Sequence, residues 1–153
     1  MSDYDVDVLA WSERQGSLLR RLATGERVND ADLDWPNIAE EIESVGDSER
    51  SALSSHIAVI IEHLIKLETS PAIEPRAGWR EIIVRARGEV ERLLEDSPSL
   101  RTGIEGAIAR EVPRARRVAA ASLMRYGEKP LPDLPSITYT DPQILDEWFP
   151  TAP

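Results

Sequence analysis

Two histidines, His56 and His63, have the most direct potential for metal chemistry, and Glu49 precedes His56 at the same seven-residue spacing. On a helix, this spacing places the side-chain origins about 10 Å apart, whereas a metal–nitrogen bond is about 2 Å long. Chelation from one helix needs a spacing of three or four residues, and the apolar Leu53 and Ile60 occupy those positions. We therefore predict no metal site and no cofactor.

A second set of residues suited to chemistry comprises Glu40, Glu41, His63 and Lys66. Together they would be the acid, base and charge-stabilising groups of a hydrolase or nuclease-like enzyme. Glu41 and His63 are too far apart on one straight helix to cooperate, so another helix or chain would have to complete the pair. The simpler interpretation is that Glu40 and Glu41 interact favourably with the positive end of a helix that begins near Pro36.

Two amide side chains are candidates for ligand contacts. Asn37 precedes Glu41 by one helical turn, so the two would present an amide and a carboxylate to the same ligand. Gln15 falls within the apolar face of the first predicted helix. Two interpretations of Gln15 stay open: a core glutamine hydrogen-bonded across the bundle, or a ligand contact.

Arg110, Arg114 and Arg117 recur at three- and four-residue steps and form one ridge on the last predicted helix. A positive ridge attracts phosphates, so weak nucleic-acid binding is one alternative function. No aromatic residues are interleaved for base stacking, and the formal net charge of −10 disfavours a polyanionic partner. We expect instead that the ridge faces the acidic start of the second helix, within the domain or across a dimer.

Charge and cysteine content limit the class of protein. Residues 1–50 contain 13 acidic and 5 basic residues, whereas residues 101–129 contain 3 acidic and 7 basic residues. Cysteine is absent, which excludes disulfides, thiolate catalysis and cysteine-ligated metals. The acidic first residues differ from a secretion signal, and no apolar run approaches the length of a membrane span. We expect an acidic, cytoplasmic protein that does not contact membranes.

Apolar residues recur at steps of three and four along most of the chain, which predicts an all-α fold. The pattern indicates a four-helix bundle-like domain over residues 1–129. Its helices are expected at about 5–23, 36–70, 76–95 and 98–126. Gly25 suits a left-handed helix end, and Pro36 suits a first helical turn.

The same spacing predicts which side of each helix is buried. The inner face of the first helix comprises Val8, Trp11, Leu18 and Leu22. The inner face of the long second helix comprises Ile38, Ile42, Val45, Leu53, Ile57, Ile60, Leu64 and Leu67.

Residues 130–153 have a different, proline-rich composition and are expected to form a tail. Asp141 and Pro142 predict one short helical turn within it, because proline is favoured at the first position of a helix. The apolar residues of this turn are expected to pack against the bundle: Ile144, Leu145, Trp148 and Phe149.

Several short motifs follow one another in a recognisable order over nearly the whole chain. They are Tyr4-Asp5-x-Asp7, Trp11, Gln15, Leu18-Leu19-Arg20, Asn37-Ile38-Ala39-Glu40-Glu41-Ile42-Glu43-Ser44, His63-Leu64-x-Lys66, Trp79, Ser97-Pro98-Ser99-Leu100 and Phe149-Pro150. This order resembles the bacterial family catalogued as domain of unknown function 29. The resemblance implies an all-helical, cytoplasmic bacterial protein, and it implies no activity and no catalytic residue. The chain departs from the family at Leu67, where an aromatic residue is typical, and at Leu134-Pro135, where Cys-Pro is usual.

No complete chemical constellation is present, so we favour a protein-interaction or structural helical module. Such a module would bind another protein or itself as a homodimer, with Trp35, Trp148 and Phe149 as apolar anchors. The enzyme and the nucleic-acid interaction remain the alternatives. Convergence of the polar candidates around one pocket would favour the enzyme, and dispersal would favour the module.

Overall fold

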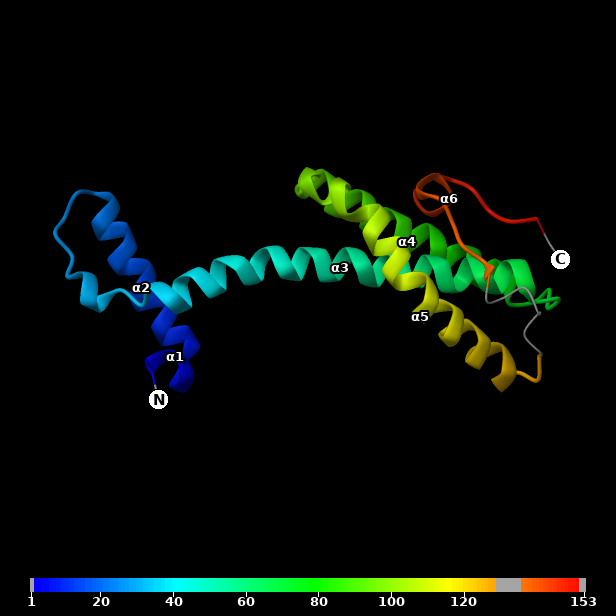
Figure 1. Ribbon diagram of the computed structural model, residues 1–153, viewed down its shortest axis with the longest axis horizontal. Helices are drawn as coiled ribbons and strands as arrows, with labels where there is room; N and C mark the ends of the chain where they lie inside the picture. Colours follow the sequence, from blue (N-terminus) through cyan, green and yellow to red (C-terminus); the bar gives the residue numbers. More distant parts are fainter. Residues whose placement is uncertain (1, 129–135, 152–153) are drawn as a thin grey trace. The chain divides into compact units, whose positions relative to one another are not determined.

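The computed structural model describes residues 2–128 and 136–151 (Figure 1). These residues form α-helices and short 3-10 helices and contain no strand, which confirms the predicted all-α class. The chain divides into two compact units, Met1–Asp47 and Ser48–Pro153. Part of the predicted tail lies outside the described residues: Pro130, Pro132, Leu134, Pro135 and Pro153.

The first unit contains α1 (Asp3–Val6), α2 (Val8–Ala23), the 3-10 helix η1 (Asp30–Asp32) and the start of α3 (Trp35–Thr69). Asp7 separates α1 from α2, because its backbone is extended and its carboxylate accepts a hydrogen bond from the N–H of Ala10 at 3.0 Å. α2 ends at Ala23, and Gly25, two residues further on, has a φ of +85°, the left-handed conformation expected after a helix end. The N–H of Glu26 then closes the helix end by donating to the carbonyl of Arg21.

The core of the first unit is small. Three apolar side chains are buried, Trp11, Leu33 and Ile38, with partly buried neighbours on α1, α2 and the loop that follows. Val8 and Leu22 were predicted on the inner face of the first helix, but both are exposed. Fewer than 50 residues enclose little interior, so one side of α2 reaches the solvent even where its residues are apolar.

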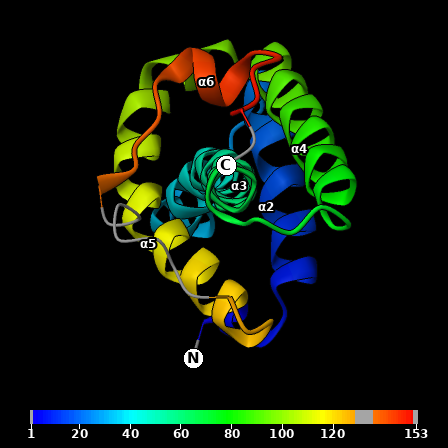
Figure 2. The same ribbon diagram turned by 90° about the vertical axis from the view of Figure 1, so that its right-hand side faces the viewer.

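The second unit is organised around the second part of α3. It adds α4 (Arg76–Asp96), the 3-10 helix η2 (Pro98–Gly103), α5 (Ile104–Arg125) and α6 (Asp141–Leu145). Figure 2 looks along this part of α3 and shows α4 and α5 on different sides of it and α6 on a third. Six side chains of α3 are completely buried: Ile57, Ile60, Ile61, Leu64, Ile65 and Leu67. A helix that is apolar on nearly all sides is expected to be central. None of the described helices combines the length and apolarity that crossing a membrane requires.

The segment around α6 is held on the second unit by polar and apolar contacts. The side chain of Thr140 caps α6, and Ile144 is completely buried. The guanidinium of Arg87 donates to the carbonyls of Gln143, Ile144 and Trp148 at 2.8, 2.9 and 2.7 Å. Because each bond ends on backbone oxygen, Arg87 fixes the path of this segment whatever its side chains are.

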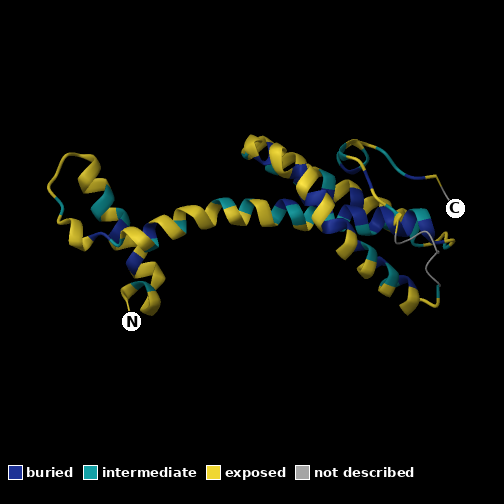
Figure 3. Cartoon of the chain, in the orientation of Figure 1, coloured by how far each residue is buried: buried dark blue, intermediate teal, exposed yellow. Residues whose placement is uncertain are grey.

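The inner face predicted for α3 is buried over only part of its length (Figure 3). Ile38 and Leu53 are buried, but Ile42 and Val45 between them are 69% and 66% exposed. The periodicity therefore identified a continuous apolar stripe, while its burial at Ile42 and Val45 was wrongly expected. Helical spacing determines which side chains share a face and does not determine whether anything covers that face.

Two isoleucine-to-alanine substitutions on this stripe test whether stability depends on the burial of a side chain or only on its position in the periodic pattern. We expect Ile57→Ala to lower the free energy of unfolding by about 2–5 kcal/mol, because the side chain is completely buried. Ile42→Ala, on the same helix, is expected to change it by less than about 0.5 kcal/mol, because the side chain is solvent-exposed. Urea unfolding followed by circular dichroism measures both values. A loss at Ile42 as large as that at Ile57 would contradict the exposure of Ile42.

Candidate functional site

A network of polar side chains joins α2 to the start of α3 in the first unit. The Asp34 carboxylate accepts hydrogen bonds at Oδ2 from Nε1 of Trp11 at 3.0 Å and from Nδ2 of Asn37 at 2.7 Å. These bonds favour the ionised form, and the bond from Asn37 is the main reason that the pKa of Asp34 lies below its ordinary value. Asn37, predicted as a ligand contact, therefore has its amide engaged within the chain.

Gln15 completes this network from inside the core. Its Nε2 donates to the carbonyl of Asp32 at 3.1 Å, and its Oε1 accepts from the N–H of Asp34 at 3.0 Å. The side chain is buried. Both ends of the amide are therefore bound to backbone groups of the loop that leads into α3, as the pairing of buried polar groups requires.

Glu41 is engaged in the same unit. The hydroxyl of Tyr4 donates to Oε1 of Glu41 at 2.5 Å. This hydrogen bond, more than any other cause, raises the pKa of Tyr4 to about 12, because ionising the phenol would remove the proton that it donates to Glu41. Glu40, its neighbour, is exposed on the same turn. Glu41 thus connects α1 to α3.

Three apolar side chains share one side of α3 in the first unit, and we call them the apolar face: Trp35, Ile42 and Val45. They occupy positions i, i+7 and i+10 and lie within an arc of about 80° on a helix. Trp35 is 44% exposed, and its Nε1 donates to Oδ1 of Asp30 at 2.8 Å. One edge of the indole is therefore fixed while its ring is accessible. The apolar face is the largest solvent-accessible set of apolar residues on one side of the described part of α3.

The other two predicted anchors lie within the second unit and are partly buried. The Phe149 ring is contacted by two guanidinium groups, those of Arg80 at 4.6 Å and Arg87 at 5.0 Å from its centroid. The ring of Trp148 lies 6.2 Å from that of Tyr139. Cation–π and aromatic contacts of this kind hold the last described residues in place.

His63 and Lys66 are buried in the second unit. Lys66 Nζ forms an ion pair with Oε1 of Glu62 at 2.7 Å. Nδ1 of His63 lies 2.8 Å from the carbonyl of Val59, a contact in which the ring nitrogen donates. Burial lowers the pKa of His63, because the charged imidazolium is poorly solvated there.

The polar candidates do not all belong to one unit. Asn37, Glu40 and Glu41 lie in the first unit, whereas His63 and Lys66 lie in the second. Each group has hydrogen bonds or ion pairs to its own neighbours, apart from the exposed Glu40. Among the described residues, no three His, Asp or Glu side chains are gathered as a metal site would require.

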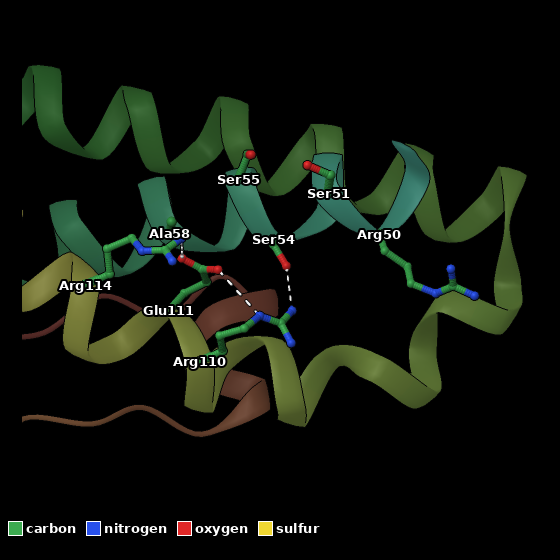
Figure 4. Close-up of a pocket in the computed structure, with 8 residues that line it drawn as sticks. All are labelled: Arg50, Ser51, Ser54, Ser55, Ala58, Arg110, Glu111 and Arg114. Atoms are coloured by element: carbon green, nitrogen blue, oxygen red, sulfur yellow. Dashed lines mark hydrogen bonds and ion pairs between the residues drawn. The ribbon is translucent and has the colours of Figure 1, made fainter. Parts of the chain in front are cut away.

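A groove in the second unit lies between α3 and α5, and we call it the serine–arginine groove (Figure 4). Its volume is about 530 Å³. The lining residues are Arg50, Ser51, Ser54, Ser55, Ala58, Arg110, Glu111 and Arg114. Arg110 and Arg114, two members of the predicted ridge, belong to it, whereas the third, Arg117, is exposed elsewhere on α5.

Several residues that bind or orient neighbouring groups were not predicted from the sequence. Asp34 was missed although it precedes the Trp35-Pro36 helix start, where an acidic residue is a typical capping signal. Glu111 was missed because a single acidic residue among arginines is usually solvated. Arg87 was missed because its partners lie more than 50 residues further along the chain, and no local pattern encodes such a contact.

The low pKa of Asp34 predicts a dependence of stability on pH. A carboxyl group whose pKa is depressed by folding stabilises the folded state above its ordinary pKa of 3.8, and this contribution is lost as the pH falls through the folded-state pKa. We expect Asn37→Ala to raise the pKa of Asp34 and to destabilise the chain at neutral pH. The part of this difference that comes from Asp34 should disappear in acid. Carboxyl-carbon NMR titration and urea unfolding at several pH values measure both effects.

Asn29→Ala is the matched control, because Asn29 accepts a hydrogen bond from the N–H of Ala31 and has no bond to Asp34. Its stability loss is expected without a change in the titration of Asp34. An unchanged Asp34 titration in Asn37→Ala would contradict the assigned cause.

Comparison with known proteins agrees with the order of the sequence motifs. The family model described as "Domain of unknown function DUF29" matches residues 4–149. The match begins at Tyr4, which binds Glu41, and ends at Phe149, which lies against Arg80 and Arg87. No curated protein and no solved structure matches the chain. The function of the family is unknown, and the chain belongs to it: it is a member of the DUF29 family.

Proposed function

We propose that the chain is a protein-interaction module whose first unit binds a basic, amphipathic helical segment of another protein. The observation that supports this proposal most directly is the apolar face, Trp35, Ile42 and Val45. Its side chains continue the stripe that is buried elsewhere along α3, yet they are accessible to solvent. Exposed apolar residues that share one side of a helix and have polar neighbours are typical of protein-binding surfaces.

The composition of the first unit strengthens this argument. Among its described residues, seven large apolar side chains are exposed and three are buried: exposed are Val6, Val8, Leu9, Leu22, Trp35, Ile42 and Val45. A unit with so small a core gains little stability from burial alone. A partner that covered the apolar face would add apolar burial worth roughly 25 cal/mol for each Å² removed from water.

Charge indicates what kind of partner fits. Residues 1–47 contain 12 acidic and 4 basic residues, so the first unit carries most of the net negative charge of the chain. Glu40 and Glu43, both exposed, lie on the same turns of α3 as Ile42. A helix with leucine-like side chains on one side and lysine or arginine beside them complements such a surface.

The same charge argues against a second copy as the occupant of the apolar face. Two first units brought together through this face would place acidic residues against acidic residues, and like charges at an interface are unfavourable. Gln15, Asn37 and Glu41, with their engaged polar groups, have the supporting role of holding α3 against α1 and α2.

We also propose that this interaction takes place in the cytoplasm. The support is compositional: 153 residues contain no cysteine, and the cytoplasm is a reducing compartment in which disulfides are not used for stability. Fractionation of cells that produce the full chain tests this location.

A designed peptide tests the binding proposal even though the natural partner is unidentified. The probe is an amphipathic helical peptide of about 20 residues made from lysine and leucine, with a glutamate–leucine peptide of the same pattern as its acidic counterpart. We expect saturable binding of the basic peptide in fluorescence anisotropy. Val45→Glu should weaken this binding about tenfold or more, because it places a charge within the apolar contact.

The matched control is Val84→Glu, the same change at a residue of α4 in the second unit that is 57% exposed. It should leave the affinity for the basic peptide unchanged. The proposal would be contradicted if both peptides bound with equal affinity. It would also be contradicted if Val45→Glu and Val84→Glu lost the same affinity for the basic peptide. A dimer that forms with rising protein concentration in sedimentation equilibrium and dissociates in Val45→Glu would instead assign the apolar face to self-association.

A further inference from the structure

We propose that the serine–arginine groove of the second unit is a binding site for a small, multiply charged, phosphate-bearing molecule. The site would use the guanidinium groups of Arg110 and Arg114 on α5 and the hydroxyl of Ser54 on α3. This inference is independent of the proposed protein-interaction function, because it rests on different residues in the other unit.

A buried carboxylate contacts two of the three guanidinium groups that line the groove. Glu111 has a side chain only 5% exposed, and its oxygens lie 3.3 Å from Nη1 of Arg114 and 3.7 Å from Nε of Arg110. Figure 4 shows the two arginines approaching Glu111 from opposite sides, while Arg50 extends away from them. An arginine whose head is already oriented loses less conformational freedom when it binds a ligand.

Ser54 restrains Arg110 further from the opposite wall of the groove. Nη2 of Arg110 donates to Oγ of Ser54 at 2.9 Å, which links α5 to α3 across the groove. Because this hydroxyl oxygen accepts from Arg110, its own hydrogen is available for donation to a ligand. The arginine side chains of the pair are 60% and 65% exposed, so their remaining N–H groups reach solvent.

Charge in the groove is opposite to that of the rest of the chain. Its charged lining residues are three arginines and one glutamate, whereas the chain as a whole has a formal net charge of −10. Guanidinium groups bind phosphate oxygens with charge-assisted, often bidentate hydrogen bonds. A local excess of positive charge with hydroxyl groups beside it is therefore suited to a phosphate.

The size and surroundings of the groove favour a small ligand over a nucleic acid. A volume of about 530 Å³ lies within the range of small-molecule sites. The residues that line the groove include no aromatic side chain on which the bases of a nucleic acid could stack. A compact ligand with two or more charges interacts with the arginines alone.

Isothermal titration calorimetry with inorganic pyrophosphate tests the site, using the full chain and a constant ionic strength set with potassium chloride. We expect saturable binding of one pyrophosphate per chain. Arg114→Gln should weaken it about tenfold or more, because one charge-assisted hydrogen-bonding group is lost.

Arg117→Gln is the matched control, since it removes the same charge from an exposed position on the same helix outside the groove. Its affinity should stay within about twofold of the unchanged chain, as expected for screened charges at the surface. Unchanged urea midpoints of the glutamine variants at Arg114 and Arg117 establish that folding is not the cause of a difference.

Three results would overturn the site. The first is the absence of saturable binding up to about 10 mM pyrophosphate, the weak limit for a specific small ligand. The second is an equal loss of pyrophosphate affinity in Arg117→Gln and Arg114→Gln, which indicates diffuse electrostatic attraction to α5. The third is binding of a single-stranded oligonucleotide under conditions in which pyrophosphate does not bind, which assigns the arginines to a nucleic-acid surface.

Discussion

Burial of the second part of α3 is the constraint on which the second unit depends. From Ile57 to Leu67 this helix has apolar side chains on nearly every side, and six of them are completely inaccessible to solvent. One neighbouring helix cannot cover such a surface. α4, α5 and α6 contribute to one buried cluster around it, and the last described residues are drawn into the same packing.

The same constraint determines what the polar residues of this region do. Lys66 lies among buried apolar residues, and a lysine is almost never buried without a partner. Its ion pair with Glu62 and the bond of His63 to a backbone carbonyl satisfy these groups where water has little access. The His63-Leu64-x-Lys66 motif, which suggested acid–base chemistry, is thus explained first by the requirement that buried polar groups be paired.

The first unit shows a comparable use of polar residues around a much smaller core. Trp11, Gln15 and Asn37 direct their polar atoms to Asp34 or to the backbone beside it. With only three buried apolar side chains, directional hydrogen bonds have a larger share in fixing α3 against α2. The motif that contains Asn37 and Glu41 therefore describes how this unit is built.

The all-α class, the end of α2 and the start of α3 were predictable because their signals are local. The left-handed Gly25 and the Trp35-Pro36 start depend on no distant residue. The exposure of Ile42 and Val45 was not predictable, since an apolar stripe has the same periodicity whether it is covered or not. The bonds from Arg87 to backbone carbonyls also lacked any signal, because any residue type provides such a carbonyl.

These findings change which residues are informative about function. The polar side chains with the most distinctive spacing are mostly engaged in holding helices together, so their arrangement says more about folding than about ligands. The accessible residues have less distinctive spacing. They are one aromatic and two aliphatic side chains on the acidic first unit, and arginines beside serines on the second unit. The function of this chain is therefore best inferred from two properties that sequence spacing does not encode. One is the solvent accessibility of a side chain, and the other is a local charge that differs from the charge around it.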